Sequence, residues 1–415
     1  MLLEFSCSNH KSIKEPIVFS MLAGTDETNL DKTKHYEKYR VLNSAVIYGA
    51  NGSGKSNFLS AISFVKRLVS NSINNQPGDW IRQNPHKTAG YEQDSIYRIQ
   101  FVTNDVRYVF GFTLNNKLIT EEYLYYFPNN KQTKIFERKG IDFHTGRSFR
   151  NKLTKCKDVL KPNRLLLSCA ANFSSVPEIE AAFRFFKEDL VIYDNNLSDN
   201  WLRYSLIQLK QNPQTKKLFL QLMQDLGLRL KDVQVEIGAA KLEETDIPPI
   251  LSEEIKDQLM QETIPSFSAS VQYEQFDTDL FLEESGGVRK LFSFLCPMID
   301  IIIHGKVLVC DELESGLHEA IVSGLLNMFL NADQKHFAQL ILATHDTSIL
   351  DLKLFRRDQI WFTELRSSDR STDLYALAEF KGVRKDENIA RGYINGKYGA
   401  IPMLNVDFAR IISST

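Results

Sequence analysis

A glycine-rich stretch near the N-terminus has the residue types and spacing of a phosphate-binding loop. Residues 49–56 read G-A-N-G-S-G-K-S, with a lysine and a hydroxyl directly after the last glycine. Such glycines let the backbone curl so that its N–H groups point at phosphate oxygens. The lysine then reaches the β- and γ-phosphates, and the hydroxyl ligates Mg²⁺. We therefore expect ATP and Mg²⁺ as ligands, held by Gly49, Asn51, Gly52, Ser53, Gly54, Lys55, Ser56 and Asn57.

Two adjacent carboxylates follow a short apolar run in the second half of the chain. Residues 307–310 have the length and composition of a buried strand, and Asp311 and Glu312 come directly after it. The carboxyl ends of parallel strands are where open α/β sheets bind their ligands. We expect Asp311 to hold Mg²⁺ through water and Glu312 to polarise the attacking water as a general base.

A histidine stands at the end of the next apolar run. Residues 340–343 read as a second strand, and Thr344, His345 and Asp346 follow it. A single histidine is more often structural than catalytic. At a strand end, however, an imidazole could hydrogen-bond the γ-phosphate or the attacking water. The predicted catalytic residues are therefore Lys55, Glu312 and His345.

Three small residues precede an amphipathic segment at 288–303. Ser285, Gly286 and Gly287 at a helix N-terminus would form a second anion site. Taken alone, such a triplet is an ordinary helix-capping signal. A single chain has no second γ-phosphate for this site, so we expect it to close over a nucleotide held by another subunit. The predicted assembly is a homodimer or a higher homo-oligomer with ATP between its subunits.

The surrounding pattern predicts the elements that position these residues. A buried strand at 44–48 precedes the phosphate loop, and Phe58, Ile62, Val65 and Val69 mark one face of the helix after it. Period-two runs separated by Asn-rich turns indicate an antiparallel β meander over about 95–145. From about 173 to 265 the composition favours helices. The predicted class is an α/β P-loop fold, divided into an N-terminal lobe (1–172), a helical insertion (173–265) and a C-terminal lobe (266–415).

The composition indicates where the protein works rather than which reaction it catalyses. The chain has 415 residues, 43% hydrophobic residues and a net charge of −2, which is ordinary for a soluble globular protein. Its five cysteines lack C-x-x-C spacing, so we expect reduced thiols in a cytoplasmic protein. Asp300, His304 and Lys306 interrupt the most apolar region, so no membrane segment is expected.

One stretch is strongly basic. Residues 138–164 contain nine lysines and arginines against Asp142 and Asp158. A solvated surface and a contact with DNA or RNA phosphates both account for such a stretch. Both interpretations remain open at this point.

The order of the motifs resembles that of ABC-type ATPases of the SMC and DNA-repair branch, whose heads dimerise around two ATP molecules. "GANGSGKSN" resembles the Walker A motif, "ESGGVRKL" the signature, "VLVCDE" the Walker B motif and "ATHD" the switch histidine. The fold implied is an ABC/SMC-like P-loop ATPase head. "LESGLH" resembles the segment that crosses the dimer seam, with Ser315, Leu317 and His318. "SNHKSI" resembles an N-terminal motif whose basic residue lies near the nucleotide, which here would be Lys11.

A narrower resemblance covers almost the whole chain. The opening "MLLEFSCSNHKSI", the loop "YGANGSGKSN" and the ending "YINGKYGAIP" are similar to RloA/AbiL-type ATPases of abortive-infection, anti-phage systems. These are often encoded beside a separate effector, such as a nuclease or toxin. Where this family often has a metal-coupling glutamine, the sequence has Ala171 and Asn172, so the resemblance makes Asn172 a candidate Mg²⁺ ligand.

Three functions follow from these resemblances. The first is an ATP-hydrolysing sensor or scaffold that controls a separate effector in anti-phage defence. The second is an SMC-like repair or recombination ATPase that acts directly on DNA, and the third is a nucleotide-gated scaffold with little turnover. The residues after His345 are too few for the Toprim nuclease domain of related overcoming-lysogenization-type nucleases. We therefore expect no nuclease activity from this chain alone.

Overall fold

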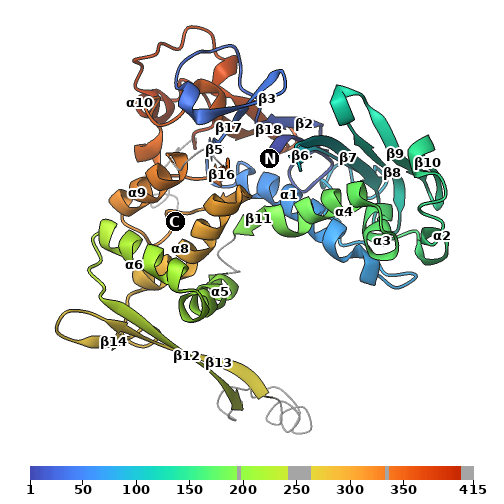
Figure 1. The fold of residues 1–415 in the computed structure, drawn as a ribbon. Helices are drawn as coiled ribbons and strands as arrows, with labels where there is room; N and C mark the ends of the chain where they lie inside the picture. The colour runs from blue at the N-terminus through green and yellow to red at the C-terminus, as the bar shows by residue number, and fades with distance from the viewer. Residues whose placement is uncertain (194–197, 242–262, 332–335, 403–415) are drawn as a thin grey trace, which may run out of the picture. The chain divides into compact units, whose positions relative to one another are not determined.

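Residues 1–193, 198–241, 263–331 and 336–402 are described by a computed structural model, drawn in Figure 1. The chain forms two structural units, each with its own packing. The first comprises Met1–Tyr193, His304–Leu313 and Asn327–Thr415, and the second comprises Asp194–Ile303 and Glu314–Leu326. The predicted phosphate loop, acid pair and switch histidine all fall in the first unit.

A six-stranded sheet of the first unit carries these residues. Its order is β11-β15-β16-β5-β17-β18, and every pair is parallel except β17 with β18. The buried apolar runs explain this arrangement, because a parallel sheet covered on both faces needs strands that are hydrophobic throughout. The strands are β5 (Ser44–Gly49), β11 (Leu190–Tyr193), β15 (Val307–Asp311), β16 (Gln339–Ala343), β17 (Ile360–Leu365) and β18 (Thr372–Ala376).

A seven-stranded antiparallel sheet forms the other layer of the first unit. Its order is β10-β9-β8-β7-β6-β1-β2, so the meander predicted over about 95–145 is confirmed as consecutive neighbours. The N-terminal strands continue it at one side. Its strands are β1 (Leu2–Ser8), β2 (Ile17–Ser20), β6 (Ser95–Thr103), β7 (Val106–Leu114), β8 (Ile119–Tyr126), β9 (Thr133–Lys139) and β10 (Asp142–Thr145).

Helix α1 (Lys55–Asn71) joins the two sheets through a common core. The Phe58 ring lies 5.9 Å from that of Phe5 and 5.2 Å from that of Phe19, while Phe19 lies 4.9 Å from Trp361 of the parallel sheet. The buried Gln339 side chain adds polar links, because its amide accepts from the Leu2 N–H and donates to the Leu2 carbonyl. The helix after the phosphate loop is thus held on its apolar face, as its residue spacing predicts.

The rest of the first unit consists of short elements. The described ones are the hairpin β3 (Thr33–Tyr36) and β4 (Tyr39–Leu42), and helices α2 (Cys156–Val159), α3 (Leu166–Phe173), α4 (Pro177–Arg184) and α10 (Ile389–Ile394). All five cysteines are buried, and none of them forms a disulfide. Burial raises the pKa of Cys156 to about 11 and that of Cys296 to about 12, so these thiols are packing residues.

The second unit combines helices with a three-stranded antiparallel sheet. Its elements are α5 (Ser198–Gln211), α6 (Pro213–Asp225), β12 (Asp232–Lys241), β13 (Thr263–Gln272), β14 (Asp277–Asp279) and α8 (Gly286–His304), and α9 (Glu319–Leu330) crosses the boundary between units. Strands β12 and β13 pair over their whole lengths and extend as a ribbon beyond β14 (Figure 1). No helix among the described residues combines the length and the apolar character needed to cross a membrane.

The segment 173–265 is therefore more varied than its composition predicts. Helices α4, α5 and α6 lie in it, but so do strands β11 and β12, while residues 242–262 fall outside the described part of the chain. Val233, Val235 and Ile237 alternate with polar residues, which is the period of a strand. The first unit also extends to Tyr193. The division at 172 and 265 stays a prediction from composition.

Candidate nucleotide-binding site

The carboxyl ends of three neighbouring strands gather the predicted residues at one edge of the parallel sheet. Asp311 of β15 pairs with Ala343 of β16, and Ala343 pairs with Ile47 of β5. The backbone continues this register beyond the strands, because the Glu312 N–H donates to the Ala343 carbonyl at 3.0 Å. The acid pair, the switch histidine and the phosphate loop thus leave adjacent strands at the same level. This is the edge at which open α/β sheets bind ligands.

The phosphate loop needs its glycines for two separate reasons. Gly52 and Gly54 have φ of 78° and 112°, which is backbone that residues with a Cβ rarely adopt. Gly49 needs space instead, since a Cβ there would lie 2.4 Å from both Ser53 Oγ and Thr363 Oγ1. A Cβ on Gly54 would also lie 2.0 Å from Thr372 Oγ1. The close approach of β17 and β18 therefore fixes the shape of the loop.

Lys55 and His345 are brought together at this loop. Lys55 is buried at the first position of α1, and its ammonium group donates to the Gly49 carbonyl at 2.7 Å and the Ala50 carbonyl at 3.3 Å. Lys55 Nζ also lies 3.5 Å from His345 Nδ1. The imidazole itself is exposed, as is Ser56. A phosphate group could reach both side chains from one side of the loop.

Glu312 has an unusual backbone. Its φ of 51° places it in the left-handed region, which costs a residue with a Cβ about 1–2 kcal/mol. The hydrogen bond to Ala343 holds the residue there. The positive φ turns the chain out of the strand directly after Asp311, at the position of the predicted general base.

Threonines from the last two strands complete the loop, and the sequence patterns gave no sign of them. Thr363 Oγ1 lies 2.6 Å from Ser53 Oγ, and Thr372 Oγ1 lies 2.9 Å from the Ser53 carbonyl. Thr372 also contacts Ser12 Oγ at 2.7 Å, and Asn57 donates to the same hydroxyl at 2.7 Å. No local pattern marks these threonines, because strand pairing alone places them under the loop.

Lys11, the basic residue of the N-terminal motif, directly precedes Ser12, whose hydroxyl contacts Asn57 and Thr372. Lys11 has φ of 50°, and its N–H donates to the Asn84 carbonyl at 2.6 Å. Partial burial, and then the nearby charge of Arg67, lower the pKa of Lys11. His10 is a packing residue: its ring nitrogens contact Tyr97 Oη at 2.8 Å and Ser60 Oγ at 3.0 Å, and burial lowers its pKa to about 3. The nucleotide contact of Lys11 stays a prediction.

Asn172 lies in the last turn of helix α3, where its side-chain amide donates to the Ser168 carbonyl at 2.8 Å. The resemblance made this residue a candidate Mg²⁺ ligand. A helical residue bonded within its own helix is a weaker candidate for a metal ligand, and that role stays a prediction.

The predicted small-residue helix start is present in the second unit. Helix α8 begins at Gly286, and Ser285 Oγ accepts from the Val288 N–H at 3.3 Å, as a helix cap does. A Cβ on Gly287 would lie 3.1 Å from the Gly316 carbonyl. Lys290 donates to the Ser315 carbonyl at 2.6 Å, which links the helix to the segment after the acid pair.

The oxygen donors at the strand edge fit Mg²⁺. Ser56 offers a hydroxyl at the start of α1 and Asp311 a carboxylate at the end of β15. Mg²⁺ is bound through few protein oxygens and completes its shell with water and substrate phosphates. The described residues contain no group of three or more His, Cys, Asp or Glu side chains that could hold a metal alone. Ser56 and Asp311 thus offer the kind of oxygen ligands that a nucleotide-bound Mg²⁺ takes, and the metal itself stays a prediction.

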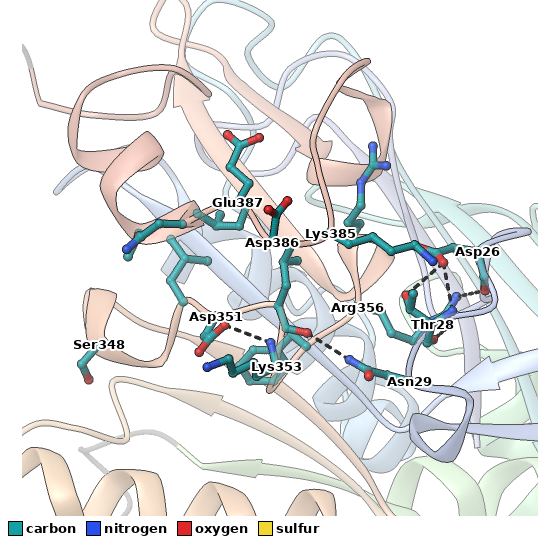
Figure 2. A pocket seen from close by; sticks show the side chains of 17 residues that line it. Asp26, Thr28, Asn29, Ser348, Asp351, Lys353, Arg356, Lys385, Asp386 and Glu387 are labelled. Atoms are coloured by element: carbon teal, nitrogen blue, oxygen red, sulfur yellow. Dashed lines mark hydrogen bonds between the residues drawn. The ribbon is translucent and has the colours of Figure 1, made fainter.

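A separate polar cavity is lined in part by residues that come soon after His345 in the sequence. It has a volume of about 510 Å³ and lies between residues 26–29, 348–357 and 385–390. Figure 2 shows Asp351, Lys353, Lys385, Asp386 and Glu387 around it. Arg356 in its wall is buried and ion-paired with Asp358 at 2.8 Å. None of the predicted nucleotide-binding residues lines this cavity, so it is distinct from the phosphate site.

Comparison with known proteins shows the family to which the chain belongs. The family model described as "AAA domain, putative AbiEii toxin, Type IV TA system" matches residues 44–153 and 171–351, which is more than half of the chain. The chain belongs to this AAA family. The match contains the phosphate loop, the acid pair and the switch histidine, so this AAA domain is expected to bind nucleotide and to act as an ATPase. No curated protein sequence matches it significantly.

Solved structures similar to this AAA domain include SMC heads. An SMC head bound to the C-terminal winged-helix domain of ScpA aligns over 90% of this chain and 97% of its own, with 12% identity and a TM-score of 0.44. The SMC head domain from Thermotoga maritima aligns over 90% and 98%, with 14% identity and a TM-score of 0.43. The α/β class with an antiparallel N-terminal sheet is confirmed by the strand order itself.

Proposed function

We propose that this AAA domain hydrolyses ATP at the edge formed by β5, β15 and β16. The approach of Lys55 Nζ to within 3.5 Å of His345 Nδ1, beside the strand that ends in Asp311, carries this proposal. The loop amides and Lys55 would bind the phosphates, while Ser56 and Asp311 would hold Mg²⁺, which neutralises phosphate charge. Glu312 would polarise the attacking water, and His345 would orient it or contact the γ-phosphate.

Replacement of the loop lysine tests this proposal. Lys55→Ala should abolish ATP binding and hydrolysis, because the buried ammonium is the only described lysine at the loop carbonyls. Binding of a fluorescent ATP analogue and phosphate release would be measured together. Lys381→Ala removes an exposed lysine far along the chain and should leave both unchanged. Unchanged hydrolysis by Lys55→Ala would contradict the assignment of the site.

We further propose that two copies pair with ATP between them, using Ser285–Gly287 of one copy over the phosphate loop of the other. The helix start at Gly286, with its N–H groups, supports this anion-binding role. Ser285→Arg should still bind ATP but should neither pair nor hydrolyse it. Mixing it with Lys55→Ala forms one complete composite site in each mixed dimer, so partial activity should return. Hydrolysis by a Ser285→Arg protein that remains monomeric would contradict pairing.

The biological role that we propose is a cytoplasmic ATP-dependent sensor or scaffold that controls a separate effector in anti-phage defence. The toxin-related family description and the ending "YINGKYGAIP" support it. The effector would be a nuclease or toxin, and its activity would be under the control of this chain. Co-expression with the product of the adjoining reading frame tests the role. Glu312→Gln, which traps ATP, should change the amount of co-purified effector, and Lys55→Ala should abolish phage protection.

A second candidate, direct contact with nucleic acid, is favoured by one observation. A hollow of about 640 Å³ beside β10 is lined by Arg147, Arg150, Lys157 and His144, and none of the described residues that line it is acidic. The basic stretch is smaller than its sequence suggests, however. Arg138 is fully buried against Glu122, and Arg164 donates to the Asn75 and Val159 carbonyls, so these two arginines hold the fold.

The salt dependence of DNA binding tests whether the basic hollow contacts nucleic acid. The double variant Arg147→Glu, Arg150→Glu should bind a labelled DNA duplex more weakly. It should also reduce the slope of the logarithm of the binding constant against the logarithm of the salt concentration by about two, because each phosphate contact contributes roughly one. Lys131→Glu with Lys117→Glu carries the same charge change at exposed positions outside the hollow and serves as the control. DNA should stimulate ATP hydrolysis in the parent protein but not in the variant of the hollow, if this function is right. Equal weakening of DNA binding by both double variants would contradict it.

A further inference from the structure

A buried tyrosine links the phosphate-loop strand to the switch loop. Tyr48 directly precedes Gly49 and is completely buried. Its hydroxyl donates to the Asp346 carbonyl at 3.0 Å, and Asp346 is the residue after His345. Side chains alternate along a strand, and Ala45 and Ile47 pack into the core around α1, so Tyr48 points to the opposite face of the sheet. There it meets the switch loop rather than the helix.

The backbone around Asp346 is held by a small set of hydrogen bonds. The Asp346 N–H donates to Thr344 Oγ1 at 3.0 Å, and the Asp346 carboxylate accepts from the Ser348 N–H at 2.8 Å. These two bonds lie within the switch loop and fix only its internal shape. The bond from Tyr48 comes from the phosphate-loop strand. The Thr344 N–H also joins the start of the loop to this strand, because it donates to the Ile47 carbonyl at 3.1 Å. The bond from Tyr48 adds a second link on the other side of the exposed imidazole, so the loop is held relative to the strand that carries Gly49.

The C-terminal segment supports the tyrosine ring. The ring centroid of Tyr48 lies 5.8 Å from that of Tyr393 in α10 and 6.5 Å from that of Phe362 in β17. Phe362 in turn stacks on Tyr393 at 5.6 Å and on Tyr398 at 5.7 Å, with interplanar angles of 21° and 18°. A ring packed this closely by its neighbours is held in one orientation. Residues 393–400 thus help to hold the hydroxyl of Tyr48 at Asp346.

We propose that Tyr48 is a positioning residue for His345, and that the rings packed on it, Tyr393 of the C-terminal segment and Phe362, act on ATP hydrolysis through it. The inference rests on the proposed ATP hydrolysis. Because Tyr48 acts on the switch loop and not on the phosphates, its hydroxyl matters for turnover and not for nucleotide affinity. The "YINGKYGA" stretch then has a mechanical role at the catalytic edge, although it contains no predicted catalytic residue.

Removal of one hydroxyl tests the proposal. Tyr48→Phe keeps the packed ring but leaves the Asp346 carbonyl without this donor, so kcat should fall about tenfold while KM and the nucleotide Kd stay within about twofold. Tyr375→Phe is the matched control. Its ring packs on Phe362 and Phe380, and its hydroxyl donates to the Tyr398 carbonyl at 2.9 Å and lies 3.2 Å from Glu364, so its hydrogen bonds are away from the switch loop. It should lower Tm comparably and leave kcat unchanged.

A double-mutant cycle separates positioning from general stability. If Tyr48 acts through His345, Tyr48→Phe should change kcat by less than about twofold when His345 is already alanine. A tenfold loss that persists in His345→Ala, a rise in KM at unchanged kcat, or an equal loss in Tyr375→Phe would each overturn the proposal.

A readout without nucleotide keeps this inference separate from the proposed function. Hydrogen exchange of the amides at 346–349 should be faster in Tyr48→Phe and unchanged in Tyr375→Phe. If the parent protein does not hydrolyse ATP, the proposed function fails, and unchanged exchange in Tyr48→Phe then overturns the link between Tyr48 and the switch loop as well.

Discussion

The first unit has two sets of charged side chains in different surroundings, one buried in the antiparallel sheet and one at the open edge of the parallel sheet. Glu122 and Arg138 are both fully buried in the antiparallel sheet, with Oε2 and Nη1 3.1 Å apart. Glu122 also accepts from the Leu166 N–H at 2.6 Å and the Leu167 N–H at 2.8 Å. Burial raises the pKa of Glu122, and Arg138 opposes that rise. Every partner here is supplied by the protein.

The strand edge of the parallel sheet is arranged differently. Ser56 and His345 are exposed, Glu312 is partly exposed, and only Lys55 is buried. Strand register and loop shape bring them together at one edge of the sheet. A charge enclosed by protein partners stabilises a fold, whereas charges placed at an open edge can exchange their contacts for those of a ligand. The variants below are designed to break or sharpen this contrast.

The largest effect is expected at the open edge. Glu312→Gln should lower kcat for ATP hydrolysis by about 10²–10⁴, the usual loss for a general base, with ATP affinity preserved. Single-turnover hydrolysis and nucleotide binding would be measured on the same preparations. Glu15→Gln, at an exposed position, should be neutral. Parent-like turnover in Glu312→Gln would mean that another group activates the water.

The next effect is expected in the buried pair. Arg138→Met should lower the free energy of unfolding by about 3–5 kcal/mol, because Glu122 then stays buried without its cation. Urea unfolding measures this loss, while kcat per folded molecule should not change. The double variant with Glu122→Leu should recover much of the stability. A fully stable single variant would show that the carbonyl and amide partners suffice.

The pH dependence of the same variant has a defined sign. Because the pKa of Glu122 is raised, the folded protein binds a proton more readily than the unfolded chain does. This contribution to stability is present at low pH and is lost as pH rises above the ordinary glutamate range. Removal of Arg138 should raise that pKa further, so the deficit of Arg138→Met should be smaller at pH 5 than at pH 8. A pH-independent deficit would contradict an ionised, unpaired Glu122.

A smaller effect is expected beneath the phosphate loop. Thr372→Val keeps the shape of the side chain but removes the hydroxyl that contacts Ser53 and Ser12. KM for ATP should rise about fivefold, the equivalent of one lost hydrogen bond, with kcat within about twofold. Thr113→Val in the antiparallel sheet is the control. A kcat effect as large as that of Glu312→Gln would place Thr372 in the chemistry itself.

The smallest effect is expected at an exposed ion pair. Lys134 and Glu137 lie 2.7 Å apart in β9, but both side chains are more than a third exposed. Glu137→Gln should change the free energy of unfolding by no more than about 1 kcal/mol, because water screens such pairs. Comparison with Arg138→Met in one urea series would measure how much burial alone adds to the same kind of contact.

The local chemistry of this protein could be predicted from its sequence. The spacing from Gly49 to Ser56, the acids after a buried strand and the small residues at Gly286 each describe one element and its end. The period-two runs likewise predict the meander, since neighbouring strands joined by short turns pair with each other. These features depend on residues close together in the chain.

Tertiary structure alone decided which of these ends meet. Strand β16 lies between β15 and β5, and that order, which no local pattern encodes, places His345 beside Lys55. Thr363 and Thr372 reach the phosphate loop only because β17 and β18 complete the sheet. Arg138 likewise belongs to a basic stretch in sequence but to a buried pair in space. Pairing between distant strands and burial depend on the whole core, so residue types specified the chemistry and packing specified where it occurs.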